Sequence, residues 1–244
     1  GGAVAAAFHR RPGIEVVVLF PKGLVSPTQE QQLTCWGDNV RSFSVRGTFD
    51  DCQRMVKQAF QDPALRAASE MTSANSINLG RLLPQAVYYA ASSLEIWRRT
   101  GEKASYVIPS GNLGNGVACV WARLLGLPIA DIVFAHGANR MLVDYLQSGE
   151  LRPRPSVPTL ASAMDVGNPS NLERLLAHHP DVESVRRAVS AEWVDDERIR
   201  ARIRADHEAY GRVWCPHTAV AAEVWATMEE SRRRAGRWVL VSTA

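Results

Sequence analysis

The chain has 244 residues, of which 46% are hydrophobic and 22% charged, a balance that is typical of a globular protein. Its 28 basic and 25 acidic residues leave a formal net charge of +3, which argues against nucleic acid or an acidic membrane surface as a partner. No apolar run approaches the roughly 20 residues that cross a bilayer. Four widely separated cysteines without a Cys-x-x-Cys pair predict free thiols in the cytoplasm, and neither a disulfide scaffold nor a metal site.

The first predicted elements alternate between strand and helix. Residues 14–20, IEVVVLF, have the length and character of a strand buried in a parallel sheet. Ser26, followed by a proline and three residues later by a glutamine, predicts a capped helix that runs to about Trp36. A second strand is predicted at residues 39–47, and Thr48 caps the next helix. This alternation predicts a doubly wound, mostly parallel α/β sheet.

The pattern changes near Asn78. A polar loop at residues 73–78 leads into a long helix that ends at Gly101. We place a domain boundary here, which gives a partial small α/β domain at residues 1–78 and an incomplete large α/β domain at residues 79–244. The apolar stripe predicted to face the core from the long helix comprises Leu82, Leu83, Val87, Ala90, Leu94 and Trp97.

A second strand–loop–helix–strand unit is predicted at residues 104–134. An irregular, proline-rich loop follows at residues 151–169, long enough to be functional. Ser170 with Glu173 predicts the cap of another helix, and three helical stretches then lead to a strand at residues 238–241. The apolar stripe predicted for the helix of this unit comprises Val117, Val120, Trp121, Leu124 and Leu125.

Both ends of the chain lack the features expected of a complete domain. Residues 1–13 read as a helix already under way, without a starter methionine or a preceding strand. Residues 236–244 form a strand with nothing after it. We therefore expect a fragment truncated at both ends.

The loop between the strand and the helix of the second unit has the composition of an anion site. Backbone N–H groups at the start of a helix that follows a parallel strand favour a negative charge. Gly111, Gly114 and Gly116 would let the backbone approach an oxygen closely, and Asn112 and Asn115 would add side-chain donors. The order Gly-x-x-Gly-x-Gly is neither the dinucleotide-binding pattern nor a Walker loop. It predicts a phosphate cradle, with a tight turn whose glycines serve only strand–helix packing as the alternative.

The segment PSGNLGN resembles the phosphate-binding loop of fold-type II pyridoxal phosphate enzymes, and in particular that of the threonine synthase family. Four further segments resemble that family in the same order along the chain: LFPKGLVSPTQEQQL, SANSINLGRLLPQAVYY, AMDVGNPSNLERLL and CPHTAVAAEV. Agreement extends from Ala5 to Ala244. The resemblance implies a tryptophan synthase β-like α/β fold with doubly wound, mostly parallel sheets in two domains, incomplete at both termini.

The resemblance also implies a lyase of threonine biosynthesis that converts the small-molecule substrate O-phosphohomoserine and water into threonine and phosphate. Its cofactor would be pyridoxal 5'-phosphate, bound through the loop amides, with the hydroxyl of Thr243 facing the pyridine nitrogen. Asn75, Ser76 and Asn78 match a family stretch that faces the cofactor, so we expect them to bind substrate unless they only cap the long helix. The residues expected to bind the cofactor are Gly111, Asn112, Leu113, Gly114, Asn115 and Thr243.

The family also uses a lysine that holds the cofactor as a Schiff base and moves protons at the substrate. Lys22, Lys57 and Lys103 are the three lysines of this sequence, and none matches the catalytic position. We therefore assign no catalytic residue and expect the chain alone to be inactive. His217 matches a family position near the last large helix, and a capping or core role is preferred for it.

Two other functions stay open at this point. A sister enzyme of the same fold, such as a threonine or serine dehydratase or a cysteine synthase, would act on a substrate without a γ-phosphate. A noncatalytic relative that binds a phosphate ester would use the same loop without turnover. A Phe-Lys-Asp segment upstream of Gly1 would favour the enzyme.

Overall fold

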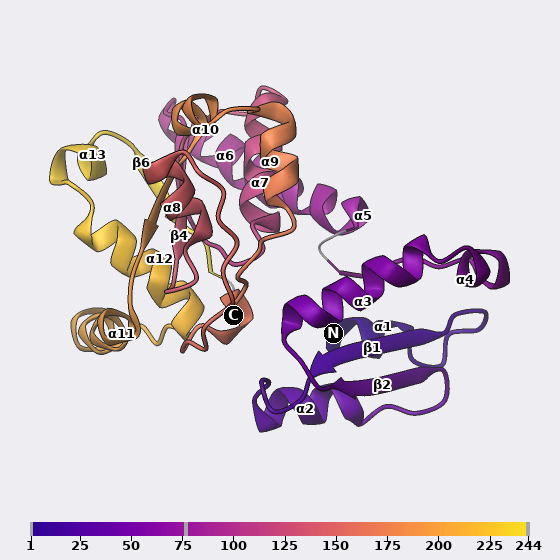
Figure 1. Cartoon of the computed structure of the whole chain (residues 1–244). Coiled ribbons are helices and arrows are strands. Elements are labelled where there is room, and N and C mark those ends of the chain that lie inside the picture. Colours follow the sequence, from indigo (N-terminus) through magenta and orange to yellow (C-terminus); the bar gives the residue numbers. More distant parts are fainter. Residues whose placement is uncertain (1, 76–77, 243–244) are drawn as a thin grey trace. The chain divides into compact units, whose positions relative to one another are not determined.

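Six strands form two parallel sheets within residues 2–75 and 78–242, the part of the chain that the computed structural model describes. Each sheet belongs to one of the two units into which the chain divides, Gly1–Asn78 and Leu79–Ala244. Figure 1 shows both units, with helices packed beside each sheet. The predicted parallel α/β architecture is therefore confirmed. Across the described residues, every helix is too short or too polar to cross a membrane.

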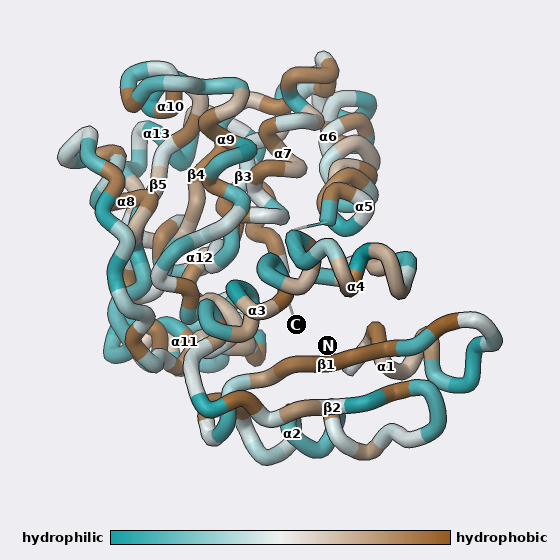
Figure 2. The backbone as a smooth tube through the Cα atoms, turned by 45° about the vertical axis from the view of Figure 1, so that its right-hand side comes forward, coloured by the Kyte–Doolittle hydropathy of each residue, from teal (hydrophilic) through white to brown (hydrophobic). Residues whose placement is uncertain are grey.

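The first unit contains a two-stranded sheet in which β1 (Val16–Pro21) pairs with β2 (Val40–Val45). Figure 2 shows β1 as a nearly continuous hydrophobic segment, as expected from its sequence. Val18 and Val40 are buried with Ala5 in a small core, so α1 and β1 pack together. The helices of this unit are α1 (Gly2–Phe8), α2 (Pro27–Thr34), α3 (Phe49–Gln61) and α4 (Pro63–Ala68).

Both predicted helix caps of the first unit form. The Ser26 hydroxyl accepts a hydrogen bond from the Gln29 N–H at 3.2 Å, and the Gln29 side chain accepts one from the Ser26 N–H in return. Thr48 and Asp51 make the same reciprocal pair at the start of α3. These contacts satisfy backbone donors that have no partner within the helix.

The second unit is built on a four-stranded parallel sheet in the order β5-β4-β3-β6. The chain runs from β3 to β4 and β5 on one side and then returns to place β6 on the other side of β3. The carboxyl end of β3 is therefore the point at which the strand order reverses, where open α/β sheets bind ligands. The strands are β3 (Ala104–Pro109), β4 (Ile129–His136), β5 (Ser190–Trp193) and β6 (Arg237–Leu240).

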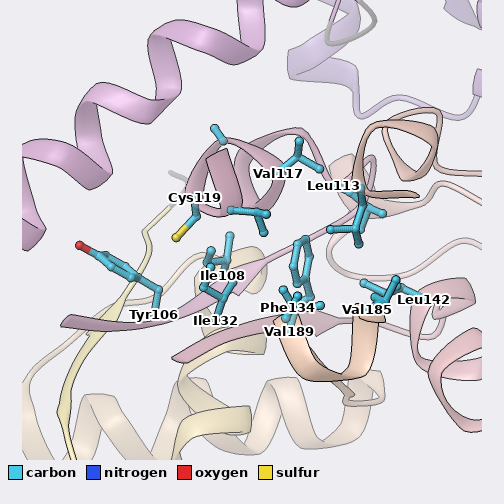
Figure 3. Close-up of a cluster of buried hydrophobic side chains, with 14 of the residues drawn as sticks. Tyr106, Ile108, Leu113, Val117, Cys119, Ile132, Phe134, Leu142, Val185 and Val189 are labelled. Atoms are coloured by element: carbon cyan, nitrogen blue, oxygen red, sulfur yellow. The ribbon is translucent and has the colours of Figure 1, made fainter. Parts of the chain in front are cut away.

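Helices cover both faces of this sheet. Figure 3 shows one face, where Tyr106 and Ile108 of β3 and Ile132 and Phe134 of β4 pack with Val117 of α7. The opposite face packs against α12 through the alternate side chains of the same strands, Val107, Val133 and Ala135. The helices and helical turns of this unit are α5 (Leu79–Leu82), η1 (Leu83–Gln85), α6 (Ala86–Thr100), α7 (Gly114–Leu124), α8 (Met141–Ser148), η2 (Ser162–Met164), α9 (Leu172–His178), α10 (Val182–Ala188), α11 (Asp196–Tyr210), α12 (Pro216–Thr227) and α13 (Glu230–Arg234).

The buried face of α6 differs from the predicted stripe. Val87 and Trp97 are exposed, whereas Tyr89 and Ser93 are buried. The Tyr89 hydroxyl donates to the side-chain oxygen of Asn115, so a polar residue enters the core with its hydrogen bond satisfied. An apolar pattern alone cannot predict this, because it assumes that the buried face is the hydrophobic one.

Two other sequence predictions for this unit are wrong in part. On α7, Val117 and Val120 are buried as predicted, but Leu124 and Leu125 are exposed at its end. The sequence predicts three helical stretches and no strand between the helix after Ser170 and the last strand, whereas the structure places the strand β5 between α10 and α11. This strand has four residues and lies at the edge of the sheet, so it carries too short a hydrophobic pattern to be recognised.

A histidine ends β4 inside the core. His136 is only 2% exposed, and neither ring nitrogen has a hydrogen-bond partner within the described residues. Burial lowers the pKa of its imidazole from the ordinary value of 6.5 to about 4. The ring is therefore neutral in the folded chain near pH 7.

This burial predicts a pH-dependent stability. In the unfolded chain His136 becomes protonated as the pH falls through 6.5, whereas in the folded chain it stays neutral down to about pH 4. The free energy of unfolding is therefore highest above pH 6.5 and decreases as the pH falls from 6.5 to 4. Relative to His136→Leu, the wild-type chain should lose about 2 kcal/mol of unfolding free energy between pH 7.5 and pH 5. Urea unfolding followed by tryptophan fluorescence measures this, because six of the seven tryptophans lie in the second unit. An identical pH dependence for the two proteins would contradict a neutral buried imidazole.

Candidate functional site

The predicted anion loop joins the most buried strand of the larger sheet to α7. Every residue of β3 is buried, and the Ser110 N–H continues the ladder by donating to the Ala135 carbonyl at 2.8 Å. The chain then turns at Leu113, whose φ of 62° and ψ of −5° lie in the left-handed region. α7 begins at the next residue, so the loop occupies the carboxyl end of β3 at the reversal of strand order.

The amides at the start of α7 are available to a ligand. The first hydrogen bond of this helix runs from the Val117 N–H to the Leu113 carbonyl, and no side chain caps its amino end. Within the described residues, the N–H groups of Leu113, Gly114, Asn115 and Gly116 donate to no backbone carbonyl. Because the helix dipole places its positive end here, these four donors favour an anion.

A cavity of about 220 Å³ lies against this loop. The loop forms one wall, and the other wall combines the turn η2 with the start of α12. The lining contains no carboxylate, so nothing in it repels an anion. The lining residues are Pro109, Ser110, Gly111, Asn112, Leu113, Gly114, Asn115, Ala163, Met164 and His217.

The two asparagine side chains of the loop bind other parts of the chain. The Asn115 side chain accepts from the Tyr89 hydroxyl and donates to Gln85 Oε1 at 2.8 Å. The Asn112 side-chain oxygen accepts from the N–H and the hydroxyl of Ser170, at 2.6 and 3.0 Å. Both side chains thereby clamp the loop, and a contact of either one with an anion stays a prediction.

The same contacts correct the predicted cap of α9. Ser170 does not cap that helix, because its hydroxyl is bonded to Asn112, and the helix begins after Asn171 without a side-chain cap. The Asn171 side chain also donates to the Asn112 carbonyl, at 3.0 Å. Residues from the far end of the 151–169 loop thus hold the anion loop in place.

Two of the three loop glycines are required by packing. A Cβ on Gly111 would lie 2.6 Å from the Cα of Met164, and a Cβ on Gly116 would lie 2.2 Å from the Phe134 ring. At these two positions the glycines therefore serve close packing, as in the alternative to a phosphate cradle. It does not remove the anion site, because the amides described above remain without backbone acceptors.

The polar loop assigned to substrate binding lies in the first unit. The Asn78 side chain donates to the Ser73 carbonyl at 2.6 Å, and the Asn75 N–H donates to the Ser73 hydroxyl at 3.1 Å. Ser76 and Thr243 lie outside the described residues. The roles of these four residues stay predictions.

His217 and the 151–169 loop supply a wall that the sequence did not predict. Asp165 accepts from the Asn139 side chain at 2.9 Å and from the Thr159 hydroxyl at 2.6 Å, which fixes the loop beside β4. Burial raises the pKa of the Asp165 carboxyl despite these bonds. The sequence signal for this wall was the segment AMDVGNPSN, which resembles the threonine synthase family. The resemblance did not indicate which residues the segment contacts.

None of the three lysines is among the residues that line this cavity. Lys103 directly precedes β3, at the edge of the sheet opposite the loop, and Lys22 and Lys57 belong to the first unit. The second unit therefore offers its anion cavity neutral donors and no lysine ammonium.

Comparison with known proteins identifies relatives of the chain. Residues 1–244 match the family described as pyridoxal-phosphate dependent enzyme. Threonine synthase of Escherichia coli (strain K12) is 37% identical over 230 residues, which cover 91% of this chain and 51% of that protein. Threonine synthase of Haemophilus influenzae is 43% identical over 175 residues, which cover 72% of this chain and 41% of that protein. The chain thus spans about half the length of these curated relatives.

Solved structures have the same fold. The crystal structure of threonine synthase from Escherichia coli has a TM-score of 0.88 at 34% identity, covering 100% of this chain and 56% of that chain. PLP-bound threonine synthase from Brucella melitensis has a TM-score of 0.82 at 31% identity, covering 100% and 57%. Maize serine racemase, with a TM-score of 0.65 at 17% identity over 97% of this chain and 67% of its own, shares the fold alone. The predicted fold class is confirmed.

The close contact at Gly111 predicts a selective loss of stability. In Gly111→Ala the added methyl group would meet a backbone atom of Met164, which cannot rotate away, so the unfolding free energy should fall by roughly 1–3 kcal/mol. Gly137→Ala is the matched control, because its Cβ would have Thr159 Oγ1 as nearest neighbour, at 3.9 Å, and should change stability by less than about 0.5 kcal/mol. Urea unfolding measures both. Equal stability of the two variants would show that the loop can move away from Met164.

Proposed function

The chain belongs to the pyridoxal-phosphate dependent enzyme family, and on that premise we propose that it is the cofactor-binding portion of a threonine synthase, which converts O-phosphohomoserine and water into threonine and phosphate. The observation that carries the proposal is the cavity formed by the PSGNLGN loop, whose lining includes Leu113, Gly114 and Asn115 at the start of α7. The threonine synthases that match most of this chain, from Escherichia coli and Brucella melitensis among others, support the choice of reaction. The proposed enzyme works in the cytosol.

The residues of this cavity fit the phosphate of pyridoxal phosphate. Within the described residues, the N–H groups of Leu113, Gly114 and Asn115 donate to no backbone carbonyl, and the cavity lining contains no carboxylate. Side chains clamp the loop through Asn112 and Asn115, so the donors are held in place before a ligand arrives. Preorganised neutral donors of this kind bind an anion without reorganisation.

The bound cofactor would supply an electron sink for chemistry at the substrate carbons. The part of the chain that does the binding is the loop, whose amides would hold the phosphate and so orient the ring. In the same proposal the Thr243 hydroxyl faces the pyridine nitrogen, and Asn75, Ser76 and Asn78 contact the substrate. A neutral hydroxyl at the nitrogen would leave it largely unprotonated, which gives a milder electron sink than a carboxylate would.

A charge change in the loop tests cofactor binding. Gly114→Asp places a carboxylate among the amides, whereas Gly114→Asn introduces a side chain of similar shape without the charge. The dissociation constant for pyridoxal phosphate, measured by fluorescence titration, should be at least about tenfold higher for the aspartate variant than for the asparagine variant, because like charges repel at short range. Equal constants for both variants and the wild type would remove the loop from the proposal.

The lysine content predicts the activity of this chain. Covalent catalysis with this cofactor needs a lysine near it, and the second unit has only Lys103, at the opposite edge of the sheet. We expect the 244-residue chain alone to form no threonine from O-phosphohomoserine, while it still binds pyridoxal phosphate. Chromatographic detection of threonine checks this, with chain purified from a host that lacks threonine synthase. Threonine formation above the buffer control would contradict the assignment of the three lysines.

A further inference from the structure

The cavity beside the anion loop is closed on its far side by His217, which has no part in the proposal above. His217 is the second residue of α12, after the capping residue Cys215 and Pro216. α12 and α7 pack on opposite faces of the sheet, and the start of each lines the cavity at the carboxyl end of β3. The imidazole therefore enters the cavity from the element opposite the amides.

One hydrogen bond fixes which nitrogen of His217 carries the proton. The Ala163 N–H donates to His217 Nε2 at 3.2 Å, so Nε2 is the acceptor. Burial lowers the pKa of this imidazole below its usual range, so the ring is neutral near pH 7. A neutral ring whose Nε2 accepts must carry its hydrogen on Nδ1.

The Nδ1–H group of His217 is an unused donor. No described residue accepts a hydrogen bond from it, and His217 is one of the residues that line the cavity. Two other polar side chains of the cavity donate elsewhere: the Ser110 hydroxyl donates to the Ile108 carbonyl at 2.8 Å, and one N–H of the Asn115 amide donates to Gln85. His217 thus offers the cavity a neutral donor opposite the backbone amides.

Resting on the proposed function, we propose that His217 contacts the bound cofactor directly and that its Nδ1–H donates a hydrogen bond to the phosphoryl group held by the amides of α7. The Ala163 contact keeps the imidazole in the tautomer that donates into the cavity. Ligand binding then adds one hydrogen bond to a charged oxygen without changing the protonation of the ring.

If His217 had a purely structural role, its Nε2 acceptor would matter and its Nδ1 donor would not, which is the reverse of the proposal. If the side chain only supports the wall at Ala163 and Met164, the acceptor at Nε2 is the important group. His217→Gln keeps an acceptor oxygen near the Nε2 position and loses the Nδ1 donor, whereas His217→Asn keeps an N–H near Nδ1 and loses the distant acceptor. The pair therefore separates ligand contact from wall support.

The test measures dissociation constants for pyridoxal phosphate in the wild type, His217→Gln and His217→Asn, with inorganic phosphate as competitor and pyridoxal as the ligand without a phosphate. We expect His217→Gln to bind pyridoxal phosphate roughly tenfold more weakly and His217→Asn to stay within about threefold of the wild type. Pyridoxal binding should be the same in all three proteins. Tight binding by His217→Gln, or the reverse order of the variants, would overturn the proposal.

A second measurement does not depend on the folding of a variant. In wild-type chain labelled with ¹⁵N-histidine, the Nδ1–H tautomer of His217 should be present without ligand, and its nitrogen signals should shift when inorganic phosphate is added. Signals that do not respond to phosphate would overturn the contact. If neither the wild type nor Gly114→Asn binds pyridoxal phosphate, the proposed function itself has failed; if only the His217 results disagree, this inference alone has failed.

Discussion

The turn at Leu113 is the constraint on which the rest of the second unit depends. The chain must turn from β3, which is buried on both faces, into α7, which packs on one of those faces. It turns at Leu113, a residue other than glycine in the left-handed conformation. Such a conformation costs about 1–3 kcal/mol, which burial of a leucine side chain offsets by a similar amount. Leu113 is 2% exposed within the core around Phe134 (Figure 3). The side chain thus stabilises a turn that leaves the following amides without acceptors.

The conformation of the loop is a property of the whole unit. Tyr89 and Gln85 reach Asn115 from helical segments 26 and 30 residues away in sequence, and Ser170 and Asn171 reach Asn112 from 58 and 59 residues away. Glycine spacing alone therefore could not decide between an anion cradle and a packing turn. In the structure, glycines at two positions allow close packing, and side-chain contacts hold the amides in place, so close packing does not exclude an anion cradle.

Helix-capping patterns in the sequence predicted the structure correctly where no residue distant in sequence bonds the capping side chain. Ser26 and Thr48 cap their helices because their partners lie three residues away. Ser170 has an equivalent pattern with Glu173, but its hydroxyl bonds Asn112 instead, and no local rule contains that competitor. The fold class and the loop could be recognised from sequence, whereas the second wall of the cavity, with His217, depends on the path of the 151–169 loop and could not.

In the proposed function, the cavity would bind a phosphate without a counter-charge. Among the described residues, its lining has neither lysine nor arginine. Backbone amides and a neutral imidazole are fixed dipoles, so their attraction for an anion depends on how accurately they are aimed. The orientation of these donors is fixed by the hydrogen bonds of the Asn112 and Asn115 side chains and by the hydrogen bond from the Ala163 N–H to His217. Binding strength at this site is therefore determined by the packing of the second unit more than by its net charge.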